Sequence, residues 1–335
     1  MKKINSRQLL IFYFIYSFGI KFLMLPSFLS AGAGRDAWIA AGVGALVELG
    51  LLFVVLLAME RKSSTKILMP LLFAFFLLQA LITLTHTNFL LSHTIYENLG
   101  KHMFVIPILV LGVFFVFSKI RAVFRSGEIF YILILVAIFL AVLPALWKAD
   151  PSEVFQGSGG GVTLIFHTVF NNLIYFEGAL ILLVFKGEVE VKKNFKRNFM
   201  IWAAIGAVVF TAFVFFFISL FGPLSGLREL GIVDVTGQNA YLAQNVRLEW
   251  IIVCVWLLLL LMRFGVLFYS CFATIANKKM KPAFFAPPLA LVVYVLFMFL
   301  PLELVLGALR IPIAIFLLGV PLLFLIWGGR NHVKD

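Results

Sequence analysis

Long apolar stretches alternate with short polar segments along the whole chain. Each stretch is close to the ~20 residues that a helix needs to cross the hydrocarbon core of a bilayer. Most charged residues lie in the segments between the stretches. We therefore predict an all-α integral membrane protein with ten transmembrane helices, at about 8–31, 37–59, 67–91, 103–118, 129–147, 162–185, 198–221, 247–271, 284–301 and 308–327.

Composition and charge agree with a membrane protein. Hydrophobic residues make up 63% of the chain and charged residues only 13%, whereas a soluble domain has about 25% charged residues. The net charge of +12 does not indicate nucleic-acid binding, because the basic residues are spread over short loops and form no stripe. With the N-terminus inside, most of them fall in segments predicted to be cytoplasmic, as the positive-inside rule requires. We expect a multi-pass protein of the cell membrane with both termini cytoplasmic.

Helix-breaking or polar residues interrupt the first and the sixth predicted helices, from Gly19 to Pro26 and from Asn171 to Gly178. Two interrupted helices five spans apart are what an inverted repeat of five plus five helices predicts. We therefore expect a single polytopic domain over residues 1–335, with one repeat at about 8–147 and the other at about 162–327.

Lys21 lies deep in the first predicted helix, between Gly19 and Pro26. An unpaired ammonium group in hydrocarbon costs several kcal/mol, so a lysine there needs a partner or a purpose. It could pair with Glu48 or Glu177, take the place of a sodium ion beside a broken helix, or titrate. The structural alternative is snorkelling, but Lys21 is far from either interface for that reach.

The sixth predicted helix carries a polar cluster at mid-span. His167, Asn171 and Gly178 share one helical face by their spacing. Glu177 joins that face only if the helix unwinds. We interpret the cluster as a substrate site at a broken helix, with Glu177 as its charge partner. Polar contacts between packed helices would give a similar pattern.

Two other helices carry polar side chains on an apolar background. In the third helix, Gln79, Thr83 and His86 form a stripe suited to line a pathway. The eighth carries Arg263 near mid-span, where it could pair with a carboxylate or receive an anionic substrate group. Glu48, in the second helix, is a candidate partner or proton carrier.

Signals of an enzyme are absent from the sequence, which has no metal-ligand spacing, nucleophile motif or nucleotide loop. The glycine-rich run at 156–161 lacks the Gly-Lys-Ser/Thr ending of a phosphate loop, and we interpret it as a flexible linker. We therefore expect no enzymatic activity, no cofactor and no bound metal.

Several segments resemble a known family. Residues 18–27 read FGIKFLMLPS and residues 33–39 read AGRDAWI. This is similar to the opening signature of the spore germination permeases, the membrane B subunits of germinant receptors. They form the GerAB/ArcD/ProY group of the amino acid–polyamine–organocation superfamily. Similarity to the sixth and eighth helices of that family lies in Phe176-Glu177-Gly178, Arg247-Leu248-Glu249-Trp250 and Val255-Trp256.

The resemblance implies a LeuT-like fold of two inverted five-helix repeats. It also implies a small germinant, often an amino acid, bound at mid-membrane between the first, third, sixth and eighth helices. The implied partners are an A-type membrane subunit and a C-type lipoprotein in the inner membrane of a spore. Together with the polar patterns, it predicts substrate-binding residues Gly19, Ile20, Thr83, His86, Asn171, Tyr175, Phe176 and Gly178, and charge-pairing or coupling residues Lys21, Glu48, Glu177 and Arg263.

The sequence leaves two functions open. The first is a germinant receptor subunit that binds a ligand and conducts ions or solutes. The second is an autonomous proton-coupled amino acid transporter. The expected fold is common to both, so it does not choose between them. A membrane scaffold with a vestigial site is a third reading.

Overall fold

The computed structural model describes residues 4–60, 68–94, 101–118, 120–155, 161–186, 189, 194–238, 248–275 and 281–330. Within these ranges the chain is all-helical, apart from one isolated β-bridge between Ile4 and Val189. The long helices are α1 (Ser6–Leu23), α3 (Ala37–Glu60), α4 (Met69–Thr94), α5 (Lys101–Phe117), α6 (Ile120–Ala145), α10 (Phe195–Phe221), α13 (Leu248–Ile275), α14 (Pro282–Phe299) and α15 (Leu302–Arg330). The shorter helical segments are α2 (Leu25–Ala33), η1 (Gly34–Asp36), η2 (Leu146–Lys148), α7 (Ser152–Phe155), α8 (Gly161–Asn171), η3 (Leu173–Phe176), η4 (Gly178–Leu180), α9 (Ile181–Val184), η5 (Gly222–Leu227) and α11 (Gly231–Gly237).

The described chain has seven helical stretches long and apolar enough to cross a membrane, or eight when the bent pair that begins with α8 is counted. This is the character of a multi-pass membrane protein, as the sequence predicts. The number falls short of ten because the apolar part of α5 is short, and because Arg7, Gln8 and Lys21 make α1 less apolar than the other long helices. The ten-span topology therefore stays a prediction.

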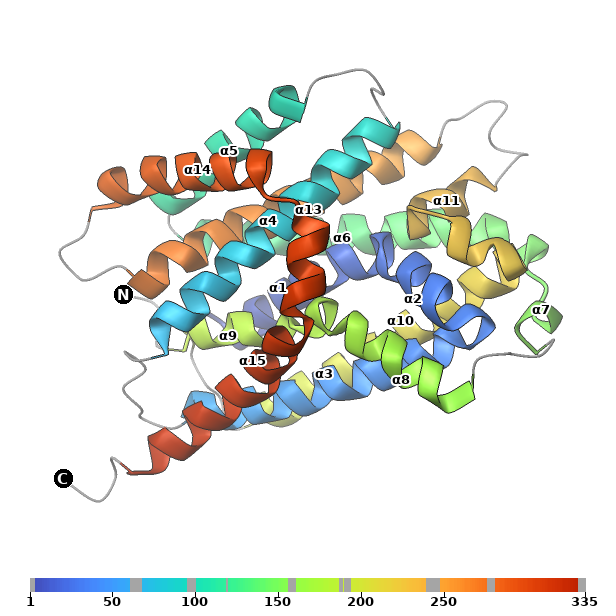
Figure 1. The fold of residues 1–335 in the computed structure, drawn as a ribbon, viewed down its shortest axis with the longest axis horizontal. Helices are drawn as coiled ribbons and strands as arrows, with labels where there is room; N and C mark the ends of the chain where they lie inside the picture. The colour runs from blue at the N-terminus through green and yellow to red at the C-terminus, as the bar shows by residue number, and fades with distance from the viewer. Residues whose placement is uncertain are drawn as a thin grey trace.

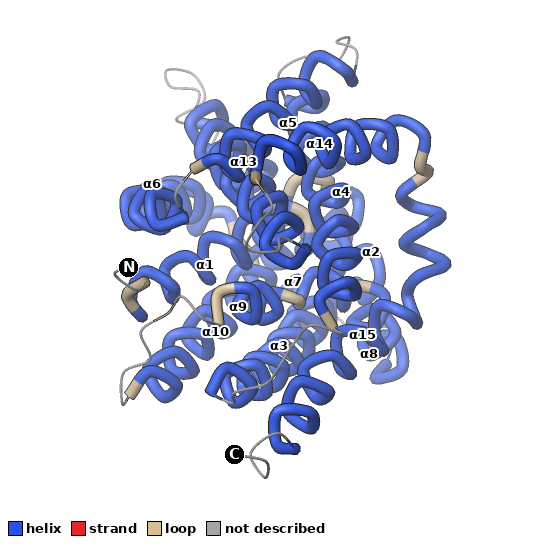
Figure 2. The backbone as a smooth tube through the Cα atoms, turned by 90° about the vertical axis from the view of Figure 1, so that its left-hand side faces the viewer, coloured by secondary structure: helices blue, strands red, loops and turns tan. Residues whose placement is uncertain are grey.

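Most of the long helices run along the length of the molecule, whereas α15 crosses them on its way from the end of α14 to the C-terminus (Figure 1). The closest neighbours are α4 with α13 and α3 with α10. The start of α1 and the end of α15 lie toward one end of the bundle, while α2, α7 and α11 gather at the opposite end. Viewed along the bundle, α1 begins at the edge beside the N-terminus, and α9 lies further in (Figure 2).

Burial separates inner from outer helices. In its most apolar window, α13 has 67% of its residues buried, whereas α14 has 17% and α6 has 22%. Apolar side chains that face outward on α6 and α14 suit contact with lipid, because a soluble surface would not carry so many of them. Arg263 belongs to α13 and is only 3% exposed, so it lies inside the bundle.

The sixth predicted span is broken, as the sequence predicts. Helix α8 ends at Asn171, and the chain continues through η3, η4 and α9 after a bend of 65°. The first span differs in extent from its prediction. Instead of a break from Gly19 to Pro26, the helix continues through Lys21 and is interrupted only at Met24. Pro26 lies in the first turn of α2, where its missing N–H leaves no hydrogen bond unmade.

After α10 the chain forms two short helices, η5 and α11, and most residues of α11 are buried. Both η5 and α11 pack against α2, and α7 packs beside η5. The glycine-rich run is described only at Gly161, the first residue of α8, and its residues 156–160 lie outside the described part of the chain, as do residues 239–247.

Candidate functional site

Two buried ion pairs lie side by side at the middle of the bundle. One joins Lys21 of α1 to Glu48 of α3, and the other joins Arg263 of α13 to Glu177 between η3 and η4. Lys21 is 4% exposed and Glu177 1%. Because a buried charge is tolerated only when it is paired and hydrogen-bonded, the sequence must supply both members of each pair. Of the two carboxylates that the sequence offers as partners of Lys21, Glu48 is the one that it contacts.

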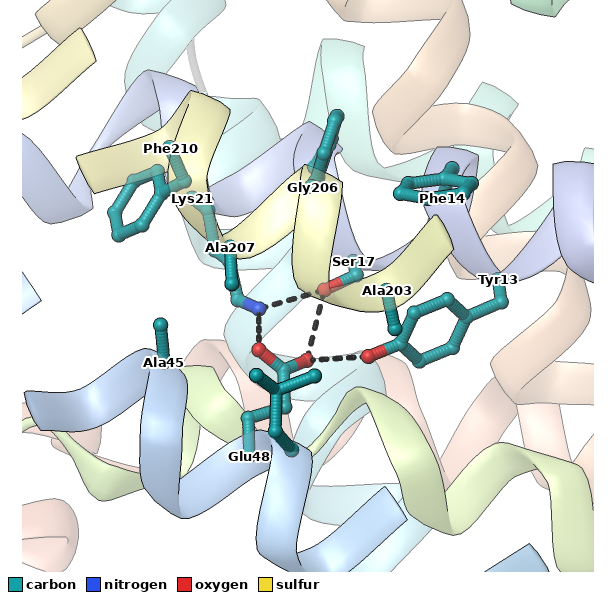
Figure 3. Close-up of a pocket in the computed structure, with 12 residues that line it drawn as sticks. Tyr13, Phe14, Ser17, Lys21, Ala45, Glu48, Ala203, Gly206, Ala207 and Phe210 are labelled. Carbon is teal, nitrogen blue, oxygen red and sulfur yellow. Dashed lines mark hydrogen bonds and ion pairs between the residues drawn. The ribbon is translucent and has the colours of Figure 1, made fainter. Parts of the chain in front are cut away.

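Side chains of α1 complete the coordination of the first pair (Figure 3). Lys21 Nζ donates to Glu48 Oε2 and, over 2.7 Å, to Ser17 Oγ. Ser17 Oγ donates to Glu48 Oε1 over 3.0 Å, and Tyr13 Oη donates to the same oxygen over 3.1 Å. The ammonium group also lies 5.4 Å from the centre of the Phe176 ring. Both carboxylate oxygens are therefore hydrogen-bonded, as a buried carboxylate requires.

The second pair has more partners, which come from α1 and α4. Arg263 donates to Glu177 Oε1 over 2.6 Å, and to the backbone carbonyl of Tyr16. It also donates to Gln79 Oε1 over 3.1 Å and to Thr83 Oγ1 over 3.3 Å. Tyr16 Oη donates to Glu177 over 3.0 Å, and the guanidinium lies 4.1 Å from the centre of the Tyr16 ring. The guanidinium of Arg263 thus donates four hydrogen bonds to groups on several segments, and its planar set of five N–H donors suits this role better than a lysine ammonium would.

The unwound sixth segment brings Glu177 to this position. Its 3-10 turns leave backbone groups without the helical i to i−4 bonds, and Gln79 Nε2 donates to one of them, the Ile174 carbonyl, over 2.9 Å. Gly178 lies directly beside the first ion pair, because a Cβ there would be 2.8 Å from Glu48 Oε1 and 3.1 Å from Ser17 Oγ. Residues 177 and 178 thus touch both pairs, one with a side chain and the other with its backbone.

Helix α1 is held against α13 on its other side. Trp256 Nε1 donates to the carbonyl of Gly19 over 3.0 Å. A Cβ on Gly19 would make only ordinary contact with Leu259, at 3.7 Å. Ile20 is fully buried, and its carbonyl accepts from Met24 N–H at the end of α1. Gly19 and Ile20 therefore belong to a regular, buried part of α1, with Gly19 packed against α13.

A ring cluster lies next to this centre. Tyr175 Oη is 3.2 Å from His86 Nε2, and His86 Nδ1 is 2.7 Å from the Ile82 carbonyl. A carbonyl can only accept, so Nδ1 carries the proton and Nε2 accepts from the Tyr175 hydroxyl. The ring of Phe28, in α2, lies 5.6 Å from that of Tyr175 and is 37% exposed. His86 and Tyr175 thus contact each other in this cluster, and their role in substrate binding stays a prediction.

Asn171 lies apart from the buried centre. Its Oδ1 accepts from Arg310 of α15 over 3.2 Å, and its Nδ2 lies 3.2 Å from His167 Nδ1. These contacts are exposed. The predicted face is therefore correct for His167 and Asn171, which lie in α8 and contact each other. It is wrong for Gly178, because the helix ends at Asn171 and the chain bends by 65° before Gly178.

Sequence reasoning missed Tyr13, Tyr16 and Ser17. A signal was present, because Tyr13, Ser17 and Lys21 are spaced by four residues and so share one face of a helix. Tyrosines in an apolar span are usually attributed to the membrane interface. For that reason the stripe of Tyr13, Ser17 and Lys21 was not recognised as part of a buried site. Tyr16 had no such signal, since its partner Glu177 is 161 residues away.

Comparison with protein-family models gives no match, and no curated protein matches the sequence. The described residues contain no group of three or more His, Cys, Asp or Glu side chains that could hold a metal ion. The chemistry available at the centre is therefore that of two adjacent, compensated ion pairs beside an unwound backbone.

Proposed function

We propose that the chain is the membrane subunit of a spore germinant receptor, and that it binds a small germinant, an amino acid, at mid-membrane. The resemblance in the first, sixth and eighth predicted helices supports the receptor class. A LeuT-like arrangement of ten spans in the inner membrane of a spore, with both termini cytoplasmic, belongs to the same proposal, as do A-type and C-type subunits as partners.

The observation that carries the proposal is the Arg263–Glu177 ion pair at the unwound sixth segment. An amino acid zwitterion has one carboxylate and one ammonium group. Arg263 can pair with the former and Glu177 with the latter, so a ligand can replace the internal pair without leaving either charge unmatched. Backbone groups freed by the 3-10 turns supply further hydrogen bonds. In this proposal Tyr175, Phe176 and His86 form the apolar and aromatic wall around the ligand.

A thermal-shift screen of amino acids against the purified full chain tests this site. We expect at least one amino acid to raise the unfolding temperature, and the shift to be lost in Glu177→Gln. The control is Glu249→Gln, which removes a carboxylate from the exposed start of α13 and should keep the shift. A ligand whose shift survives in Glu177→Gln would place the site elsewhere. Copurification with A-type and C-type subunits tests the receptor assignment separately.

The second candidate function, an autonomous proton-coupled transporter, is favoured by the surroundings of Glu48. A cavity of about 10 Å³ lies between α1, α3 and α10, beside Glu48, Lys21, Ser17 and Tyr13. That volume holds about one water molecule, which suits a carboxylate that exchanges a proton. Uptake of labelled amino acid into liposomes that contain this chain alone, driven by a pH gradient and lost in Glu48→Gln, would favour the transporter. Absence of uptake with intact ligand binding would favour the receptor.

A further inference from the structure

A larger pocket lies at the end of the bundle where α1 and α10 begin, away from both ion pairs. Its volume is about 480 Å³, within the range of pockets that bind small molecules. The first turns of the two helices form its walls, with Asn5 and Arg7 on one side and Asn194 and Asn198 on the other. Nothing in the proposed ligand-binding or proton-carrying function uses these residues.

The polar half of the pocket is rich in hydrogen-bond donors. Arg7 is exposed, and none of the described acidic side chains forms an ion pair with it. Asn194 and Asn198 are also exposed and offer amide N–H groups. The Asn5 Oδ1 atom is occupied, because it accepts from the Arg7 backbone N–H, so its amide nitrogen is the group left to donate. One fixed positive charge surrounded by neutral donors suits a phosphate or carboxylate group.

The other half of the pocket is apolar and opens onto the outer face of α10. Leu10 and Trp202 line it, and Trp202 is 47% exposed. Beyond them, Ile201, Ile205 and Val208 follow at helical spacing and are all exposed. A half-exposed tryptophan between a polar rim and an apolar stripe is typical of the boundary between lipid headgroups and acyl chains.

We propose that this pocket binds an anionic phospholipid, with its phosphate on Arg7, Asn194 and Asn198 and an acyl chain along the apolar stripe of α10. The adjacent apolar stripe is the reason to choose a lipid over a free phosphate, because a soluble anion would leave Trp202 and the stripe unused. The positive charges of Lys196 and Arg197, in the first turn of α10, favour an anionic over a zwitterionic headgroup. A lipid bound here joins the start of α1 to the start of α10.

Thermal unfolding of the full chain in a neutral detergent, with phosphatidylglycerol or phosphatidylcholine added, tests the proposal. Phosphatidylglycerol should raise the unfolding temperature more than phosphatidylcholine does, and native mass spectrometry should detect it bound. Arg7→Gln and Asn198→Leu should each weaken phosphatidylglycerol binding by about tenfold or more. The matched control is Arg125→Gln in α6, an exposed arginine outside the pocket, which should bind as the unchanged chain does.

Three results would overturn the proposal. If phosphatidylglycerol and phosphatidylcholine raise the unfolding temperature equally, the pocket does not require an anionic lipid. Equal losses in Arg7→Gln and Arg125→Gln would indicate a general effect of net charge. An equal shift from glycerol 3-phosphate, which has the headgroup chemistry without acyl chains, would make this a site for soluble phosphates. Each readout is independent of amino acid binding, so failure of the proposed germinant site leaves the test intact.

Discussion

A Cβ atom added to Gly178 would lie 2.8 Å from Glu48 Oε1, so the backbone of the unwound segment rests directly against the carboxylate that pairs with Lys21. The preceding residue, Glu177, pairs with Arg263 over 2.6 Å. A displacement of this short piece of backbone therefore alters the surroundings of both ion pairs at once. The two ion pairs, although their residues come from different helices, are therefore linked through the backbone at residues 177 and 178 and form one structural unit.

Replacing Gly178 with alanine should disturb this unit. The added methyl group would lie 2.8 Å from Glu48 Oε1, closer than real Cβ contacts, and 3.1 Å from Ser17 Oγ, which is a tight contact. Such overpacking costs about 1–3 kcal/mol. We expect a lower unfolding temperature and loss of the amino acid shift. The control is Gly50→Ala in α3, where a Cβ meets nothing within 4 Å and alanine favours the helix. An unchanged ligand shift in Gly178→Ala would contradict the close packing.

Removing one member of the Lys21–Glu48 pair should be worse than removing both. Lys21→Met leaves the Glu48 carboxylate buried without its cation, which costs about 3–5 kcal/mol. Glu48→Gln likewise leaves the Lys21 ammonium group buried without its carboxylate, at a similar cost. The double variant Lys21→Met, Glu48→Gln leaves no charge at this position. We expect it to be more stable than either single variant when unfolding is measured in detergent.

A double-mutant cycle on the four proteins gives the coupling energy directly. If the two single losses simply add in the double variant, Lys21 and Glu48 do not interact in the folded protein. If the double variant still binds the amino acid, the Lys21–Glu48 pair serves coupling or structure. Ligand binding would then belong to the Arg263–Glu177 pair.

The sequence predicted the components of the site better than their arrangement. Lys21, Glu48, Glu177 and Arg263 were identifiable because a charge inside an apolar helix is expensive and therefore rarely accidental. Their pairing was not predictable, since Lys21 had two candidate carboxylates. The choice depends on which helix faces which, and apolar helices that are buried nearly all round carry little directional pattern.

The first and sixth breaks show a second limit. Gly19 and Pro26 weaken a helix in isolation, but packing of α1 against α6, α10 and α13 keeps it helical through Lys21. In the sixth segment, by contrast, the buried contacts of Glu177 are made by an unwound chain. Asn171 was assigned to the site by helical spacing, which ceases to apply beyond a bend of 65°. Low helix propensity in the sequence therefore indicated where the two spans are interrupted. Tertiary contacts determine how many residues of each span are unwound.

Tyr16 should contribute to the second pair through both its ring and its hydroxyl group, and the two can be separated. Tyr16→Phe keeps the ring 4.1 Å from the Arg263 guanidinium but removes the hydrogen bond to Glu177. Losing a hydrogen bond to a charged group costs about 1.5–3 kcal/mol, and Tyr16→Ala should cost more. The control is Tyr131→Phe in α6, whose hydroxyl makes no hydrogen bond with a described residue. Equal stability of Tyr16→Phe and the unchanged chain would show that the hydroxyl group is dispensable.

Membrane orientation can be tested at opposite ends of the bundle. Ser152, in α7, and Arg197, in α10, are both exposed, and the positive-inside pattern predicts that the first is outside and the second cytoplasmic. Single cysteines at these positions, in a background with Cys254 and Cys271 changed to serine, can be labelled in intact cells with a membrane-impermeant maleimide. We expect labelling of Ser152→Cys in intact cells, and of Arg197→Cys only after the membrane is permeabilised. The reverse result would show that the orientation is opposite to the predicted one. Labelling of both positions in intact cells would place Ser152 and Arg197 on the same side of the membrane. That result would contradict an α10 that spans the membrane.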